Sequence, residues 1–257
     1  MKKLLTFILS ITLSTAVWSQ DEKICPVGEF HSVVAGSTME LALQESSQPS
    51  VKIIADKALM PYIQVYVRSR VLYVDMDEKS IPADVKKLYK GKNAPVPVTR
   101  VLVSAPSLFK VSGTGNALIT SYGGVVADTL TLSDKSVARD ILLRVPSPRV
   151  IMDRSAQASL SYSGEVISLE LSGNADCTLS GETGTLSFRS ERKARLNSLS
   201  CNSRRVKADM KGSSEACVHA EEFLFVNLTG GSALYYTGIP AITVDQILKS
   251  TFAPYEK

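Results

Sequence analysis

Histidine and tryptophan are almost absent from this chain of 257 residues, which has two histidines, one tryptophan and only 7% aromatic residues. Two histidines leave little room for histidine-based acid–base catalysis or for a histidine-rich metal site. Charge is also nearly balanced, since 29 Lys and Arg stand against 25 Asp and Glu, a net charge of +4. This small positive excess gives no reason to expect binding to nucleic acid. Glycine and proline are at ordinary levels, which excludes a collagen-like or low-complexity chain.

Long hydrophobic runs are missing too, apart from one at the N-terminus. Lys2 and Lys3 precede an apolar run at residues 4–17, which is too short for a membrane-spanning helix of about 20 residues. Followed by Val17-Trp18-Ser19, this pattern is typical of a secretory signal peptide over residues 1–19, with cleavage before Gln20. We therefore expect an exported protein without a transmembrane segment, in the periplasm, on the outer surface or secreted.

The spacing of the four cysteines matches no zinc motif. Cys25, Cys177, Cys201 and Cys217 all lie far from one another in the chain, whereas zinc sites use closely spaced cysteine pairs. Export permits disulfides. However, Cys177 and Cys217 lie in strand-like alternation, where a cysteine is usually a small buried residue. We expect free, buried thiols at these two positions and leave the state of Cys25 and Cys201 open.

The hydrophobic pattern indicates strands throughout. Between residues 30 and 107, short β-branched runs alternate with polar residues at a period of two and end at turn-forming residues. One mixed stretch, residues 81–96, could form a helical turn or two before Pro95 and Pro97 end it. The sequence thus predicts a β-strand-rich N-terminal part over residues 20–107, continuous with the region that follows.

From residue 108 the pattern repeats with a period of about 20 residues, which indicates a solenoid. Each repeat is an alternating strand, a small polar turn and a second short strand. The points taken as equivalent are Ala117, Val137, Ala158, Ala175, Ala194, Ala216 and Ala233. Apolar and polar residues alternate over runs of strand length. The apolar spacing of helices and the sequence pattern of leucine-rich repeats are both missing, which favours a parallel β-helix. We therefore predict an all-β fold, a right-handed parallel β-helix of about seven coils over residues 108–240, with the alanines as inward corner residues.

The last segment, residues 241–257, keeps apolar residues at Ile242, Val244, Ile247 and Leu248. A solenoid needs its terminal coil covered, because an open edge leaves backbone groups unpaired and core exposed. We predict that this segment folds back over the last coil as a cap, with Ile247 and Leu248 buried. The alternative is a disordered tail.

The same regions carry a family resemblance. The resemblance rests on Phe30–Val33, Met39–Leu43, Val71–Val74, Val101–Leu108, Ser112–Gly115, Leu224–Ser232 and Tyr235–Pro240. From about Gly28 to Pro240 the chain resembles the head GIN domain family of auto-transporter adhesins, although Ser133–Ser136 and Arg189–Arg192 lack the usual glycines. The resemblance implies a β-helical cell-envelope protein and supplies no catalytic residues.

Positive charge is concentrated between residues 189 and 211. The cations are Arg189, Arg192, Lys193, Arg195, Arg204, Arg205, Lys207 and Lys211, against two acidic residues. If stacked coils gather these cations on one face, that face would suit an anionic glycan, lipopolysaccharide or nucleic acid. The alternative is a solvated surface that discourages edge-to-edge aggregation. Aromatic residues that could stack on sugars are scarce in this run, Phe188 being the only one.

Catalytic and metal-binding patterns are weak. Asp128, Asp153, Asp176 and Asp209 occur at different offsets in their repeats, so they are not expected to converge as a glycosidase pair. The acidic run Asp75–Glu78 lacks the glycine and distal glutamate of a calcium loop. His219 alternates with Val218 and Ala220, and we expect it to point to solvent.

These observations predict a non-catalytic, exported cell-envelope protein that binds a glycan or a protein partner as an adhesin does, with no cofactor and no metal. Two alternatives stay open, a carbohydrate-active β-helix enzyme and a purely structural envelope component. Converging carboxylates in a cleft would favour the enzyme, whereas an exposed ladder of polar and basic groups would favour binding.

Overall fold

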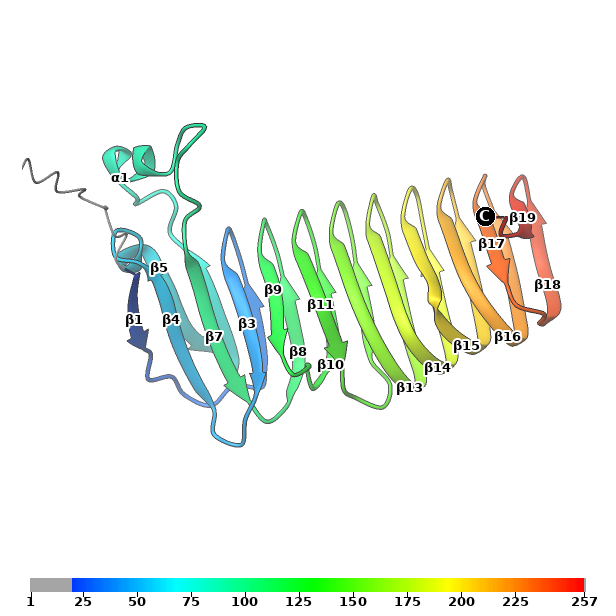
Figure 1. The fold of residues 1–257 in the computed structure, drawn as a ribbon, viewed down its shortest axis with the longest axis horizontal. Helices are drawn as coiled ribbons and strands as arrows, with labels where there is room; N and C mark the ends of the chain where they lie inside the picture. The colour runs from blue at the N-terminus through cyan, green and yellow to red at the C-terminus, as the bar shows by residue number, and fades with distance from the viewer. Residues whose placement is uncertain (1–19, 257) are drawn as a thin grey trace, which may run out of the picture.

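The structure is a computed structural model that describes residues 20–256, and it is nearly all β, with 63% strand and 4% helix. The strands stack into an elongated β-solenoid (Figure 1). The predicted all-β solenoid is confirmed, with about eight turns rather than about seven. The predicted signal peptide lies outside the described residues. Between residues 20 and 256, no helix is long and apolar enough to cross a membrane.

The first coil lies inside the stack rather than at its end. The N-terminal elements are β1 (Gln20–Ile24), β2 (Ser32–Ala35), β3 (Glu40–Glu45), β4 (Ser50–Asp56), the 3₁₀ helix η1 (Met60–Tyr62), β5 (Ile63–Arg68), β6 (Val71–Met76), α1 (Ala83–Leu88) and β7 (Thr99–Ala105). On one side, β2 and β3 pair in parallel with β6 and β7. On the other side they pair in parallel with β8 (Leu108–Gly113) and β9 (Leu118–Tyr122). The helical turn expected within residues 81–96 is present as α1.

Antiparallel strands close the N-terminal end of the stack. β4 pairs with β7, and β1 with β4, in antiparallel fashion, while β5 and β6 form a hairpin. The hairpin turns at Ser69 and Arg70, whose φ values of 52° and 60° lie in the left-handed region, as a two-residue hairpin requires. The change from parallel to antiparallel pairing ends the regular stacking of coils at this side.

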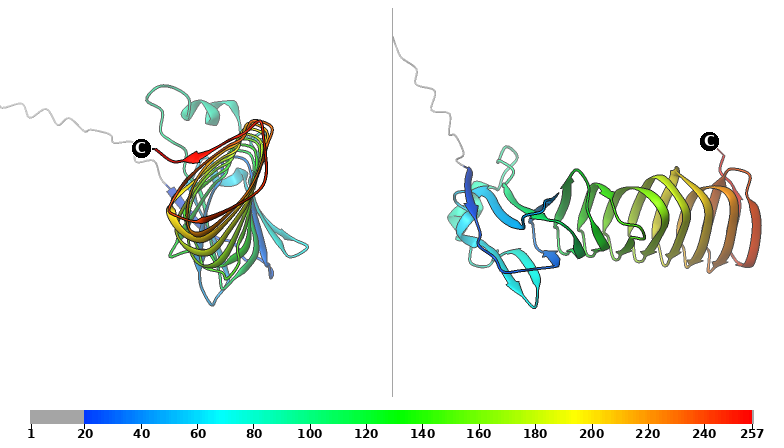
Figure 2. Two further views of the ribbon diagram at one scale, coloured as in Figure 1. Left: turned by 90° about the vertical axis from the view of Figure 1, so that its right-hand side faces the viewer. Right: turned by 90° about the horizontal axis from the view of Figure 1, so that it is seen from below.

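From residue 108 onward, each coil gives one strand to each of two faces. The strands after β9 are β10 (Ala127–Leu132), β11 (Val137–Leu143), β12 (Arg149–Met152), β13 (Gln157–Leu171), β14 (Asp176–Ser190), β15 (Arg195–Lys211), β16 (Glu215–Thr229), β17 (Ala233–Thr237), β18 (Ala241–Leu248) and β19 (Thr251–Pro254). Face 1 comprises β8, β10, β12, the second halves of β13–β16, and β18. Face 2 comprises β9, β11, the first halves of β13–β16, β17 and β19. Seen along the rod, the coils are flattened and superimpose (Figure 2).

One edge of the solenoid is a stack of tight turns with left-handed backbone. The residues with positive φ in these turns are Ser37, Gly115, Asp134, Arg154, Gly173, Arg192, Gly212, Gly230, Gly231 and Lys249. Backbone hydrogen bonds join successive turns, as where the Lys193 N–H donates to the Gly173 carbonyl at 2.8 Å. The glycines missing from two repeats therefore do not interrupt the stack, because Asp134 and Arg192 adopt the same conformation.

The residue that precedes each face 2 strand points into the core and is small. Strand register makes Ala117, Ser136, Ala156, Ala175, Ala194, Ser214 and Ser232 equivalent, and all are buried. The equivalent positions predicted from the sequence are therefore right at Ala117, Ala175 and Ala194. They are wrong by one or two positions at Val137, Ala158, Ala216 and Ala233, because serine replaces alanine in three coils and a second alanine follows Ala156. The serine hydroxyls are paired locally, Ser136 Oγ donating to the Ser133 carbonyl at 2.7 Å.

Residues 241–254 add a further coil. β18 pairs in parallel with the second half of β16, and β19 with β17. The predicted cap with buried Ile247 and Leu248 is wrong, since these side chains are 39% and 52% exposed. Ile242 and Val244 continue the core rows of Leu224 and Val226, but no later strand of the described chain covers them. The apolar residues of this segment extend the solenoid instead of closing it.

The cysteines differ in their surroundings. All four are free, and burial is the main cause that raises the pKa of Cys177 to about 12. The expectation of a buried thiol is wrong for Cys217. Its neighbours Ala216 and Val218 point inward, so Cys217 faces outward and is half-buried. Register places Cys177 two coils from Ala216, which is ~10 Å along the stack. A disulfide needs Cα atoms within about 7 Å.

We expect thiol reagents to modify Cys217 and to spare Cys177 in the folded protein. The thiolate is the reactive form, and Cys177 is both buried and held with a pKa of about 12. Labelling with iodoacetamide at mildly alkaline pH, followed by peptide mapping, should show at least tenfold faster modification of Cys217. In denaturant the two rates should converge. Rapid labelling of Cys177 in the folded protein, or recovery of a Cys177–Cys217 bridge, would contradict the strand register.

Candidate functional site

An open groove of about 590 Å³ crosses the outer side of face 1 between β13 and β18. Its outward-pointing lining residues are Ser168, Glu170, Ser187, Arg189, Lys207, Asp209, Phe225, Asn227, Thr243 and Asp245. Because face 1 is built from parallel strands in register, these side chains form rows that run along the rod, with one residue per coil. Adjacent members of a row are spaced by the ~4.8 Å separation of paired strands.

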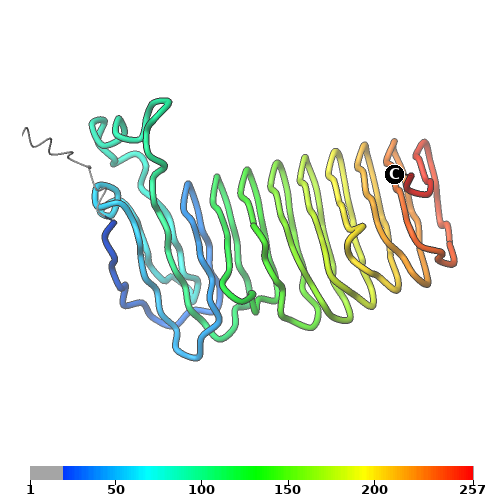
Figure 3. Tube along the Cα trace, in the orientation of Figure 1, coloured from blue at the N-terminus to red at the C-terminus, as the bar shows by residue number. Residues whose placement is uncertain are grey.

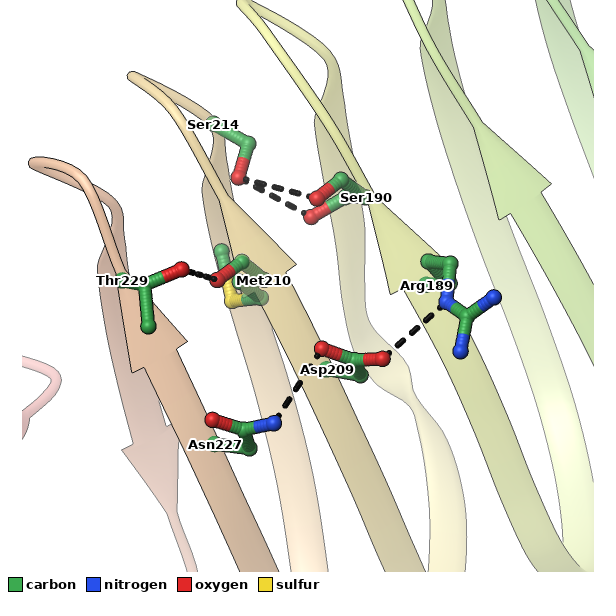
Figure 4. Close-up of polar contacts among 7 residues, drawn as sticks. All are labelled: Arg189, Ser190, Asp209, Met210, Ser214, Asn227 and Thr229. Carbon is green, nitrogen blue, oxygen red and sulfur yellow. Dashed lines mark hydrogen bonds and ion pairs between the residues drawn. The ribbon is translucent and has the colours of Figure 1, made fainter. Parts of the chain in front are cut away.

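One row is a ladder of charged and amide side chains, and Figure 4 shows its central part. Arg189 Nε donates to Asp209 Oδ2 at 3.0 Å, and Asn227 Nδ2 donates to Asp209 Oδ1 at 3.4 Å. From the neighbouring row, Arg149, whose register partner is Ser168, donates across to Glu170 Oε1 at 2.6 Å. Exposed ion pairs contribute at most about 1 kcal/mol to stability. Their consequence here is geometric, since they hold donors and acceptors in a fixed, alternating order on the surface.

Aromatic rings and cations line and flank the other side of the groove: Phe225 and Lys207 line it, and Phe223 and Arg205 lie beside it. Phe223 and Phe225 on β16 are 42% and 38% exposed, and their ring centroids are 6.4 Å apart. Register places Phe223 beside Arg205, and Phe225 beside Lys207, on the neighbouring strand β15. Neither cation forms an ion pair with another residue of the described chain. Apolar rings and uncompensated positive charge therefore lie next to the polar ladder.

Sequence reasoning missed these two aromatic residues. It considered Phe188, which directly precedes the basic run but is buried and points into the core. Phe223 and Phe225 lie one coil further along the chain than Arg205 and Lys207. Searching for aromatic residues one repeat away from the cations would have found them.

The basic run does not gather on one face. Arg189 and Lys207 line the groove, and Arg205 lies beside it. The other cations point elsewhere: Arg192 and Lys193 in a tight turn, Arg195 at the start of β15 on face 2, Arg204 at the opposite edge near Glu165, and Lys211 at the end of β15. The physical reason is that each repeat of the chain travels once around the solenoid, so a cluster in sequence is spread over all sides. Binding by these cations stays a prediction.

The carboxylates singled out from the sequence are likewise dispersed. Asp128 lies on face 1, Asp153 in a tight turn and Asp176 on face 2, far from Asp209 in the groove. The two groove carboxylates that belong to the ladder, Glu170 and Asp209, are each paired with an arginine. Within residues 20–256, no group of three His, Cys, Asp or Glu side chains could hold a metal ion.

Two further candidates have local structural roles. His219 points outward on face 2, and its Nδ1 lies 2.9 Å from Thr237 Oγ1. Asp77 accepts hydrogen bonds from the Ser80 hydroxyl at 2.6 Å and the Ser80 N–H at 3.2 Å, which hold the pKa of Asp77 below its usual value. The acidic run Asp75–Glu78 therefore includes a turn with its own donors.

The geometry defines a class of protein: a β-solenoid that carries an open groove of polar and aromatic residues on one face. The chain belongs to the family described as "Putative auto-transporter adhesin, head GIN domain", whose model matches residues 29–240. The resemblance seen in the sequence is thereby confirmed. The coil formed by β18 and β19 lies beyond the matched range.

Solved structures share the fold. A putative adhesin from Parabacteroides distasonis superimposes with a TM-score of 0.75 at 16% identity, covering 92% of this chain and 97% of that one. A putative lipid binding protein from the same organism gives 0.69 at 13% identity, with coverages of 92% and 97%. A putative adhesin from Parabacteroides merdae gives 0.65 at 19% identity, with coverages of 92% and 96%. No functionally curated protein matches the chain.

Proposed function

We propose that the protein is an exported, adhesin-like binding protein that holds an extended glycan in the groove of face 1. The observation that carries this proposal is the register of β15 and β16, which sets Phe223 and Phe225 beside Arg205 and Lys207. Family membership supports an adhesin-like role and a location at the cell surface or outside the cell.

Each part of the groove suits a different part of a sugar chain. Exposed phenylalanine rings offer apolar surface to the non-polar face of a sugar ring. The ladder of Arg189, Asp209 and Asn227 offers both donors and acceptors for hydroxyl groups. Arg205 and Lys207 would bind carboxylate or sulfate groups through charge-assisted hydrogen bonds. An open groove that crosses several coils also lets a polymer continue past both ends of the site, so we expect an anionic polysaccharide.

A carbohydrate-active enzyme and a purely structural envelope component remain the alternatives, and the groove gives the enzyme little support. Glycoside cleavage uses two carboxyl groups that face each other across the scissile bond. Here Glu170 and Asp209 belong to strands two apart in the same row and point outward in parallel, each with its own arginine. Incubating the protein with any polysaccharide that it binds, and assaying reducing ends, would reveal cleavage directly.

Charge reversal in the groove tests the binding proposal. A glycan array probed with residues 20–257 selects the polysaccharide, and calorimetry at low salt then compares variants. We expect Lys207→Glu to weaken binding roughly tenfold, since a hydrogen bond to a charged group contributes about 1.5–3 kcal/mol. Phe225→Ala should also weaken binding, because it removes the apolar ring on which a sugar would pack. The matched control is Arg192→Glu, which makes the same charge change in a tight turn outside the groove. Equal loss in Lys207→Glu and Arg192→Glu would show that binding follows net charge, and would overturn the proposal.

A further inference from the structure

The segment between β6 and β7 leaves the solenoid at the opposite end from the groove. It comprises residues 77–98 and carries α1, which stands outside the outline of the stacked coils (Figures 2 and 3). Between this segment and the solenoid lies a pocket of about 290 Å³ that is open to solvent and is called the cavity below. The buried residues that line it are Leu59 and Met76 from the solenoid and Ile81 from the segment itself. The interior of the cavity is therefore apolar.

Contacts with the solenoid hold the segment that carries α1 in place beside the cavity. Tyr89 lines it and packs against the core together with Val85, one turn earlier on the same segment. Burial and the neighbouring carboxylate of Asp56 raise the pKa of Tyr89 to about 12. Asp56 is itself buried and accepts a hydrogen bond from the Val98 N–H at 3.2 Å. The middle of the segment, at Tyr89, and its C-terminal end, at Val98, are thus tied to the solenoid.

Positive charge surrounds the mouth. Lys86 and Lys90, one helical turn apart in the chain, line the cavity, and neither forms an ion pair within the described chain. Between residues 79 and 92 there are five lysines and one acidic residue, Asp84. Glu78 also lines the cavity, where its Oε1 accepts from Thr38 Oγ1 at 3.4 Å. The mouth therefore carries two lysines against one carboxylate.

We propose that this cavity binds a single-chain anionic amphiphile, with the acyl chain on Leu59, Met76 and Ile81 and the carboxylate or phosphate head between Lys86 and Lys90. Its volume lies just below the roughly 300–1,000 Å³ of ordinary ligand pockets, so it suits one short acyl chain better than a two-chain lipid. The site shares no residue with the groove, and the inference does not depend on the glycan-binding proposal.

Calorimetry of residues 20–257 with three probes separates the contributions of head and tail. Octanoate, kept below its micelle concentration, carries both parts, whereas 1-octanol lacks the charge and acetate lacks the tail. We expect octanoate to bind at least fivefold more tightly than 1-octanol, and acetate not to bind. The heat capacity change should be negative, as for burial of apolar surface. Absence of binding by octanoate at every concentration below micelle formation would overturn the proposal.

Variants of α1 and its surroundings identify the site. Lys86→Glu and Lys90→Glu should each weaken octanoate binding at least fivefold and leave 1-octanol unchanged. Glu78→Gln should strengthen octanoate binding about twofold, because a repulsive carboxylate is removed. Thr38→Trp, a substitution on the rim, should block both ligands by filling the cavity. Circular dichroism melts would verify that each variant is folded.

The matched control is Lys87→Glu, which reverses a charge on α1 at a position that does not line the cavity. It should change octanoate binding less than twofold. If Lys87→Glu weakens binding as much as Lys86→Glu, the lysines act as a general basic patch and the cavity has no ligand role. Binding to vesicles of anionic phospholipid without binding to free octanoate would likewise overturn the proposal, in favour of attachment to a membrane surface.

Discussion

Gly181→Ala is expected to destabilise the folded protein by about 3 kcal/mol or more, through strain and contact together. Gly181 lies within β14 and has a φ of 113°, a backbone angle that residues with a side chain rarely adopt. A Cβ atom at this position would lie 2.1 Å from the carbonyl oxygen of Tyr162, its register partner in the preceding coil. Relief of this clash requires the two coils to separate, because the obstructing atom belongs to the backbone.

Thermal unfolding measures the effect, and Gly123→Ala separates its two causes. Gly123 also has a positive φ, 80°, but a Cβ there would meet no atom within 4 Å. This control should show only the backbone strain. For a chain of this size, 1 kcal/mol shifts the melting temperature by roughly 2–4 °C, so Gly181→Ala should melt well below the control. Equal melting temperatures would mean that the close approach of coils at Tyr162 is wrong.

The general fold could be predicted because its signals are local. Apolar and polar residues that alternate at a period of two indicate strands, and a pattern that recurs at a fixed longer period indicates stacked coils. Both signals can be read without knowing which distant segments of the chain pair. The order of the first coils could not be predicted in this way. β2 and β3 pair with both β6–β7 and β8–β9, and such pairings between distant segments leave no local pattern. The additional coil formed by β18 and β19 could not be predicted either, because a cap and a further coil both require alternating apolar residues.

The groove was harder to predict than the fold, because it depends on exact register. Arg205 and Phe223 become neighbours only after the register between β15 and β16 shifts near Ser203. Because of this irregularity, the step along the chain from Arg205 to Phe223 is shorter than the step from Arg195 to its partner Glu215. A uniform repeat would place each cation beside another residue. Charge clustering in the sequence therefore indicated the right coil but not which face of it.

The column of small residues beside the tight turns leaves no room for larger side chains, and Ala194→Leu tests this. Ala194 is buried between Ala175 and Ser214 in the neighbouring coils, at the ~4.8 Å spacing of paired strands. Three added carbons would have to displace the apolar core or the turn above or below. Overpacking of this kind usually costs about 1–3 kcal/mol, which corresponds to a fall of roughly 2–12 °C in melting temperature.

Ala233→Leu is the informative partner of that variant, because the repeat read from the sequence treats Ala194 and Ala233 as equivalent. The strand register instead makes Ser232 the inward residue and leaves Ala233 half-buried on the outer side, paired with Glu215 and Thr251. Leucine at position 233 should therefore change stability by no more than about 0.5 kcal/mol, as at other surface sites. Thermal melts of the two variants decide between the repeat read from the sequence and the strand register of the structure. Equal losses in the two variants would restore the repeat read from the sequence, whereas a clearly smaller loss in Ala233→Leu would support serine as the inward residue of the last coils.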